Sequence, residues 1–379
     1  MKTLSTRTLA AALLALAAWM LPPAGAQVVA PPAEAAEEAP ERPHVQLAIL
    51  LDNSGSMSGL IDQARGQIWQ IINDLALARH DGQRPHLEVA LYIYGNPPAT
   101  QLVPLTTDLD LVSERLFAVT TAGGSEYCGA VIQTAVNDLA WRDGHADLKM
   151  IFIAGNEPFN QGPVDYREAC RAAIAKGITV NTIHCGDGLP EGWREGAQLA
   201  DGQATTINHN QTAVAIAAPQ DEKILALNQQ LNQTYVPFGQ QGAEGFARQQ
   251  VQDANASKMS KSNLAQRAAA KASGYYQNAG WDLVDAQKQE SFDWADVKDE
   301  DLPENMQKMS LEERKAYIAG LEKERKELRE KISKLNQARV AFVTEKRKEQ
   351  SEDALDRALI ESIRTQARNR DYDFTDEKE

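Results

Sequence analysis

The sequence predicts an α/β fold, in which a doubly wound, mostly parallel sheet of Rossmann-like type is followed by an α-helical C-terminal extension. Short, almost continuously apolar runs recur between residues 44 and 235, as expected for strands covered on both faces. Segments with apolar residues at helical spacing separate these runs. Alternation of strands and helices favours a parallel sheet with helices on both sides.

The first predicted domain, residues 44–235, contains six candidate strands. They are Val45–Leu51, Leu87–Tyr94, Gln101–Leu105, Leu148–Ile153, Thr179–His184 and Thr205–Asn208. The third contains a proline and is therefore expected at a sheet edge. The predicted helices are an apolar stripe from Ile61 to Leu75 and the segments Ala130–Leu139, Tyr166–Ala175 and Glu222–Leu231.

Residues 1–26 have the pattern of a secretory signal peptide. Lys2 and Arg7 precede the apolar run Leu9–Leu21, and Ala24-Gly25-Ala26 offers a small-residue cleavage site. The apolar run is too short for an ordinary membrane span, so we expect cleavage after Ala26 and no stable span afterwards. The mature protein is then periplasmic or secreted. Residues 27–43 are rich in Pro, Ala and Glu and are expected to be a linker.

The mature chain is acidic. Cleavage removes two basic residues and changes the formal net charge from −14 to −16. Basic residues near 323–334 alternate with glutamate, which is typical of a solvated helix face. An acidic protein without a basic patch is a poor partner for a polyanion, and we therefore expect no nucleic-acid binding.

Two further segments follow the first domain. Residues 236–300 are expected to be a loosely helical extension, and residues 301–379 a long helix and a tail. Ser310 and Glu313 form a capping box. The heptad positions a and d then carry Leu311, Arg314, Ile318, Leu321, Arg325, Leu328, Ile332, Leu335, Arg339 and Phe342. Because arginines interrupt this seam, two alternatives stay open: a helix that folds against its own chain, and self-association through residues 310–345 as a coiled coil.

The candidate site begins where the first strand ends. Asp52, Ser54 and Ser56 follow the strand at alternate positions, and alternate residues of an extended segment point the same way. Ligands of open α/β sheets bind at the carboxyl ends of the strands. One carboxylate and two hydroxyls suit a hard divalent cation, with Mg²⁺ expected and Mn²⁺ or Ca²⁺ as alternatives.

The strand followed by Asp-x-Ser-x-Ser resembles the von Willebrand factor type A family, in which this pattern opens a metal-ion-dependent adhesion site. The resemblance covers residues 44–235 and implies that Ser125, after Gly123-Gly124, supplies a hydroxyl from a second loop. The family's third loop carries an aspartate, and Gly155 stands at that position here. The residues that would compensate are Glu126, Asn156 and Glu157.

The three cysteines suggest a disulfide more strongly than a nucleophile. Cys128 is expected at a helix start and Cys185 at a strand end, both near the carboxyl edge of the sheet, so they are the preferred pair in an oxidising compartment. Cys170 is then left on its helix, and three reduced thiols are the alternative. A thiol enzyme would use Cys128 as the nucleophile and His184 or His209 as its base. His184 and Cys185 are adjacent in a strand and face opposite ways, so these two residues do not easily share one site.

No nucleophile elbow, phosphate loop or His-Glu-x-x-His motif occurs in the sequence, so we expect a protein that is not an enzyme. The resemblance implies an exported protein that binds a partner protein, whose acidic side chain completes the coordination of the metal. The alternative is a structural or scaffold protein with a degenerate metal site, which acts through its long C-terminal helix.

Overall fold

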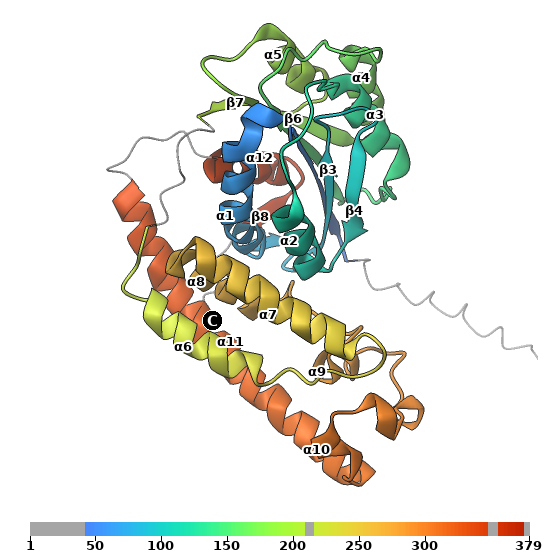
Figure 1. The fold of residues 1–379 in the computed structure, drawn as a ribbon, viewed down its shortest axis with the longest axis vertical. Coiled ribbons are helices and arrows are strands. Elements are labelled where there is room, and N and C mark those ends of the chain that lie inside the picture. The colour runs from blue at the N-terminus through green and yellow to red at the C-terminus, as the bar shows by residue number, and fades with distance from the viewer. Residues whose placement is uncertain (1–41, 209–215, 348–354, 375–379) are drawn as a thin grey trace, which may run out of the picture. The chain divides into compact units, whose positions relative to one another are not determined.

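The computed structural model describes residues 42–208, 216–347 and 355–374. The predicted signal peptide and almost all of the predicted linker lie outside these ranges, as does His209. No helix among the described residues is long and apolar enough to cross a membrane. Figure 1 shows the arrangement of the elements in sequence order from blue to red.

The central sheet has six strands in the order β4-β3-β1-β5-β6-β7. Five of them are parallel: β1 (His44–Leu51), β3 (His86–Ile93), β5 (Leu148–Gly155), β6 (Ile178–Cys185) and β7 (Ala204–Ile207). The proline-containing strand, β4 (Thr100–Thr106), pairs antiparallel with β3 at the edge, as predicted. The predicted doubly wound, mostly parallel sheet is confirmed.

Each face of the sheet is covered by helices and has its own apolar core. Val45, Leu47 and Leu51 face one core, while Ala48 and Leu50 face the other. The first core is completed by α1 (Ser58–Leu75), α2 (Leu109–Ala118) and α12 (Leu355–Arg368), and the second by α3 (Cys128–Asp138), α4 (Tyr166–Ala175) and α5 (Glu191–Leu199).

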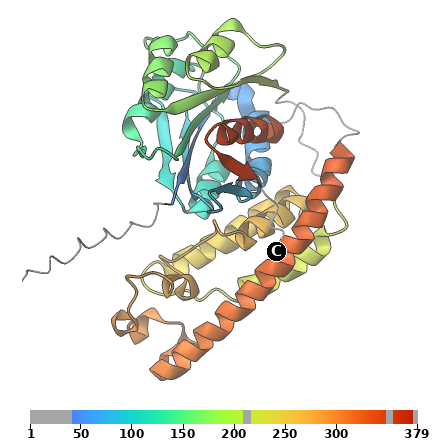
Figure 2. The same ribbon diagram turned by 180° about the vertical axis from the view of Figure 1, so that it is seen from behind.

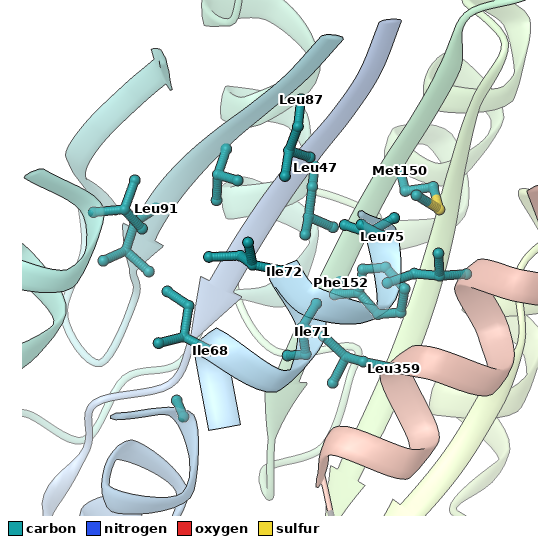
Figure 3. Packing of buried hydrophobic residues seen from close by; sticks show 14 of the residues in the cluster. Leu47, Ile68, Ile71, Ile72, Leu75, Leu87, Leu91, Met150, Phe152 and Leu359 are labelled. Atoms are coloured by element: carbon teal, nitrogen blue, oxygen red, sulfur yellow. The ribbon is translucent and has the colours of Figure 1, made fainter. Parts of the chain in front are cut away.

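The C-terminal tail returns to the sheet, which the sequence analysis did not anticipate. Leu359 and Ile363 of α12 are buried in the first core, where Figure 3 shows Leu359 beside Ile71 of α1. Gln366 exchanges hydrogen bonds with Asn181 of β6, at 2.6 Å from its Nε2 to Asn181 Oδ1. The last described strand, β8 (Tyr372–Phe374), pairs with β2 (Ala78–His80). The sheet domain is therefore built from two separate stretches of sequence (Figure 2).

A helical module, residues 221–347, lies between these stretches. It contains α6 (Asp221–Asn232), α7 (Gly242–Met259), α8 (Lys261–Ala272), the short helices α9 (Leu283–Ala286) and α10 (Glu304–Gln307), and the long α11 (Leu311–Arg347). The sequence predicts the helix at Glu222–Leu231 as the last helix of the first domain. In the structure this helix, α6, packs against α8 and α11 of the helical module instead. Residues 236–300 are also more regular than expected, because α7 and α8 occupy much of them.

The predicted capping box begins α11 as expected. The Ser310 backbone N–H donates to Glu313 Oε2 at 2.8 Å, and the Glu313 backbone N–H donates to Ser310 Oγ at 3.4 Å. Ile318, Leu328 and Ile332 of the heptad seam are buried inside the module. Helices of the same chain thus cover the apolar positions of the predicted coiled-coil seam. This is the alternative in which the long helix folds against its own chain.

The arginines that interrupt the seam are used inside the module. Arg325 is buried and bonds Asp282 Oδ2 at 2.6 Å and Asp285 Oδ1 at 3.1 Å. Arg339 is also buried and bonds Asp221 Oδ1 at 2.8 Å. Each arginine joins α11 to another part of the module through a charge-assisted hydrogen bond, which is stronger than one between neutral groups.

A third buried arginine joins the module to the sheet domain. Arg267 of α8 bonds Asp110 Oδ1 of α2 and Asp253 Oδ1 of α7, each at 2.6 Å, and its side chain is 0% exposed. Its guanidinium also lies 4.7 Å from the ring centroid of Trp69 in α1. Tyr276 donates to the other oxygen of Asp110 at 2.5 Å. Both acids of this network are therefore neutralised within the protein.

Replacing the central arginine should destabilise the protein strongly. Arg267→Met leaves Asp110 and Asp253 buried without their main cation, and breaking a buried pair in this way costs about 3–5 kcal/mol of unfolding free energy. Urea denaturation measures the change. The matched control is Arg194→Met, which removes an exposed arginine paired with Glu191 at 3.0 Å and should cost about 1 kcal/mol or less. Equal effects of the two substitutions would contradict the role given to Arg267.

The same network predicts a pH dependence. Burial would raise the pKa of Asp253, but Lys271 and Arg267 outweigh burial and lower it below the usual range. The stabilisation is complete above about pH 4 and declines as pH falls, because the unfolded chain takes up the proton first. The difference in unfolding free energy between wild type and Asp253→Asn should therefore be about 1 kcal/mol smaller at pH 3 than at pH 5. A difference that does not change with pH would refute this.

Candidate metal centre

The loop after β1 gathers the three oxygen-bearing side chains predicted from the sequence. Asp52 is 0% exposed, and its backbone N–H donates to Ala154 O at 2.9 Å. Asp52 Oδ1 accepts a hydrogen bond from the backbone N–H of Ser54 at 2.7 Å. The hydroxyls of Ser54 and Ser56 lie 3.4 Å apart. The expected convergence of Asp52, Ser54 and Ser56 is thus present at the carboxyl edge of the sheet.

The loop after β5 meets this cluster from the other side. Asn156 Nδ2 donates to Ser56 Oγ at 3.2 Å, which brings the predicted Asn156 to the site. The Asn156 backbone N–H faces the Asp52 carboxylate and lowers the pKa of Asp52. Glu157 lies close enough to raise the pKa of Asp52 by charge repulsion, while its own Oε2 accepts from Gln161 Nε2 at 3.0 Å.

Asn53 joins the first loop to the second. Its Oδ1 accepts from Gly95 N–H at 2.8 Å, and its Nδ2 donates to Thr120 O at 3.1 Å. Gly95 O in turn accepts from Gly124 N–H at 3.0 Å and from Ser125 N–H at 3.3 Å. Backbone hydrogen bonds therefore hold the second loop in place. Asn53 positions this loop, a role that the sequence alone did not predict.

The second loop presents two predicted residues, Ser125 and Glu126, in different ways. Ser125 is half-buried, and its hydroxyl makes no hydrogen bond with a described residue. Glu126 is 4% exposed, and its pKa is raised by burial and by the charges of Asp52 and Glu157, with a hydrogen bond from Ser54 acting in the opposite direction. The carboxylate that the second loop brings next to Asp52 is thus that of Glu126, and the role of the Ser125 hydroxyl stays a prediction.

The electrostatics of this cluster favour a bound cation. Burial raises the pKa of Asp52, and Glu157 adds to this, against the hydrogen bonds of Ser54 and Asn156. Asp52 Oδ2 is buried and accepts no hydrogen bond of normal geometry, whereas most buried polar atoms are hydrogen-bonded. A carboxylate oxygen in this position, next to two hydroxyls and a second acid, matches the hard oxygen ligands that Mg²⁺ takes. The residues present therefore fit a divalent cation.

A cation bound at this centre would need oxygen ligands other than carboxylates. Among the described residues, no group of three or more His, Cys, Asp or Glu side chains is placed to hold a metal ion. The candidate centre instead combines the acids Asp52 and Glu126 with serine hydroxyls. A cation with few formal charges around it stays electrophilic and keeps affinity for an outside carboxylate.

Tyr94 explains why the third loop has a glycine. The Tyr94 hydroxyl is buried and donates to Ala154 O at 2.8 Å. A Cβ atom at Gly155 would lie 2.4 Å from Tyr94 Oη and 3.1 Å from Asp52 Oδ2. The space that an aspartate would need at position 155 is thus filled by the Tyr94 side chain. The only signal in the sequence was that Tyr94 ends the second predicted strand.

Two of the three cysteines, Cys128 and Cys185, lie near this centre. All three are free and buried, which differs from the expected Cys128–Cys185 pair. Cys128 and Cys185 both lie near the Tyr94 phenol and raise its pKa, after burial as the largest cause. Burial raises the pKa of all three thiols, the opposite of what a thiol nucleophile requires. His184 Nδ1 contacts Gly188 O at 2.8 Å, on the side of the sheet where Trp193 lies.

Comparison with known families agrees with the resemblance drawn from the sequence. Residues 46–217 match the family model described as von Willebrand factor type A domain. This range begins inside β1 and extends beyond β7, so it contains nearly all of the six-stranded sheet. No curated protein matches the chain.

Several solved structures are similar to this chain. The VWA domain of SpRpn10 is 16% identical with a TM-score of 0.35, covering 43% of this chain and 88% of that one. The conserved hypothetical protein BatB from Bacteroides thetaiotaomicron is 18% identical with a TM-score of 0.34, covering 43% and 90%. Proximal thread matrix protein 1 from the mussel byssus, with a zinc-occupied MIDAS motif, is 17% identical with a TM-score of 0.35, covering 44% and 42%. Each similarity extends over less than half of this chain.

The contact between Tyr94 and Gly155 yields a double-mutant prediction. Gly155→Ala should destabilise the protein by about 1–3 kcal/mol, as overpacking of a buried site does. Removing the hydroxyl with Tyr94→Phe makes room, so adding Gly155→Ala to that variant should cost clearly less. Urea denaturation of the four proteins measures the coupling. Gly124→Ala is the control, because nothing lies within 4 Å of a Cβ there. Additive effects of the two substitutions would show that Tyr94 does not exclude a side chain at position 155.

Proposed function

We propose, for a chain whose residues 46–217 are a von Willebrand factor type A domain, that this domain binds a partner protein through a divalent cation. Asp52, Ser54 and Ser56 would hold the cation, with Glu126 as the second acid. The cation would supply an open coordination position for an aspartate or glutamate of the partner. The observation that carries the proposal is the buried Asp52 Oδ2, which accepts no hydrogen bond of normal geometry, in a loop where the hydroxyls of Ser54 and Ser56 lie 3.4 Å apart.

The chain's own residues prepare this site in three ways. The Ser54 backbone N–H orients the Asp52 carboxylate by bonding Oδ1, which leaves Oδ2 for a ligand. Asn156 bonds the Ser56 hydroxyl and so restricts its rotation. Burial and the surrounding acids raise the pKa of Asp52 and Glu126, so that a cation bound among them would relieve the repulsion. Mg²⁺ is the expected ion, with Mn²⁺ and Ca²⁺ as alternatives.

We propose further that the protein acts by binding and not by catalysis, outside the cytoplasm. The raised pKa values of the thiols disfavour a cysteine nucleophile at neutral pH. The basic and apolar pattern of residues 1–26 supports export to the periplasm or beyond. A glycine in the third loop favours a second candidate, a scaffold protein that binds no metal and works through its helical module.

Isothermal titration calorimetry of the full mature protein with Mg²⁺ and with Mn²⁺ tests whether the candidate metal centre binds an ion. Wild type should bind one ion, and Asp52→Ala should abolish binding because it removes the central carboxylate. Glu126→Gln should weaken binding about tenfold, the lower end of the effect seen when a group supporting a metal site is lost. Ser58→Ala is the matched control, since Ser58 is an exposed serine four residues after Ser54. Absence of binding to wild type would reject the metal centre and leave the scaffold function.

A second measurement tests the partner. Immobilised wild-type protein should retain a protein from an extract of the organism's exported proteins in the presence of Mg²⁺ and release it with EDTA. Asp52→Ala should retain none of it, while Ser58→Ala should behave as wild type. Retention that is unchanged both by EDTA and by Asp52→Ala would defeat the proposal even if the ion binds.

A further inference from the structure

A groove of about 380 Å³ lies beside the candidate metal centre. It begins at Asn53, the residue that follows Asp52, and extends between the loop after β3, strand β4 and the end of α2. Its volume falls within the range of about 300–1,000 Å³ that is usual for ligand sites. The lining residues are Asn53, Ile93, Asn96, Thr100, Leu102, Arg115, Ala118, Val119, Thr120 and Ala122.

The lining has an apolar floor and a polar rim. Val119 is buried and Ile93 and Leu102 are half-buried, whereas Asn96, Thr100 and Thr120 are exposed. A floor of this kind accepts the aliphatic part of a side chain, and the rim offers hydrogen-bond donors to a polar end. The groove therefore fits an amphipathic side chain better than a bare ion.

The lining of the groove carries one positive charge, that of Arg115, whereas the acids of α2 and its N-cap pair with arginines of the helical module. Asp110 pairs with Arg267 at 2.6 Å, and Glu114 pairs with Arg248 at 3.4 Å. Asp108, at the N-terminus of the same helix, also pairs with Arg248, at 3.0 Å. Arg115 is exposed and makes no ion pair with any described residue. The ten lining residues thus include one cation and no acid.

The walls of the groove are held in place before any ligand arrives. Arg65 of α1 donates to Leu116 O at 3.2 Å, to Phe117 O at 3.1 Å and to Val119 O at 2.5 Å, which fixes the chain after α2. The Asn53 amide bonds Thr120 O at 3.1 Å on the opposite side. A preorganised site loses less conformational entropy when it binds.

We infer that this groove receives a second acidic side chain of the partner, on Arg115, while a first acidic side chain reaches the cation. The ligand is then a protein segment with two carboxylates separated by a few residues. A nucleic acid does not fit, because one arginine in the lining of an acidic chain offers a polyanion too little positive charge. This inference rests on the proposed function, since the first carboxylate is placed by the metal.

Short peptides test the inference on the full mature protein. The probes are acetylated and amidated peptides with two glutamates separated by one, two or three alanines, and the same peptides with one glutamate replaced by glutamine. Ligand-observed NMR in Mg²⁺ measures the dissociation constants. At one of the three spacings the two-acid peptide should bind about fivefold more tightly than its one-acid counterpart, the gain expected of one additional ion pair.

Variants then assign this gain to Arg115. Arg115→Gln should remove the fivefold difference and leave both the one-acid peptide and Mg²⁺ binding unchanged. Arg171→Gln, which alters an exposed arginine of α4 on the other face of the sheet, should leave the difference intact. If the one-acid peptide binds but the second acid adds nothing at any spacing, or if the gain survives Arg115→Gln, this inference is overturned and the proposed function stands. If no peptide requires Mg²⁺, the proposed function fails as well.

Discussion

The site depends on the way β1 ends. This strand is hydrogen-bonded along its whole length to β3 on one side and to β5 on the other, so its last residues leave the sheet inside the protein and not at its surface. Asp52, the first residue beyond the strand, is consequently a fully buried carboxylate. Its backbone is held by Ala154 of β5, and one of its oxygens is held by the next turn. The other oxygen is buried and accepts no hydrogen bond of normal geometry.

The surrounding loops compensate for a third loop that carries no acid. Tyr94 fills the space in front of Gly155, so the carboxylates of the centre come from the first and second loops, as Asp52 and Glu126. This arrangement brings two acids and the serine hydroxyls together at the candidate centre. The Tyr94 phenol also lies near the buried thiols of Cys128 and Cys185, whose pKa values are raised by burial.

The helical module influences the sheet domain through charge as well as packing. Its arginines pair with the acids of α2 and its N-cap, whereas Arg115 of the same helix lines the groove and makes no ion pair with a described residue. The module itself is held by buried ion pairs at Arg325 and Arg339, positions where a coiled coil would have apolar residues. Such pairs are sensitive to the loss of one partner, and they specify which helices meet.

Much of the fold followed from local pattern. The apolar runs, the proline of the edge strand and the capping box at Ser310 act over a few residues, and each predicted element is present close to its expected bounds. The cluster of Asp52, Ser54 and Ser56 was predictable for the same reason, because a strand and the turn after it determine where these side chains point. Sequence therefore determined the sheet, the position of the candidate site and the placing of its first three oxygen-bearing side chains.

Tertiary structure decided everything that depends on residues far apart in the chain. The return of α12 to the sheet, the burial of Arg267 against Asp110 and the filling of the space at Gly155 by Tyr94 each join segments separated by tens or hundreds of residues. The same holds for the charge interaction of Glu126 with Asp52, which joins the second loop to the first. Local pattern carries no information on these contacts, because a side chain's neighbours across the fold are set by how the elements pack and not by its own position in a helix or strand.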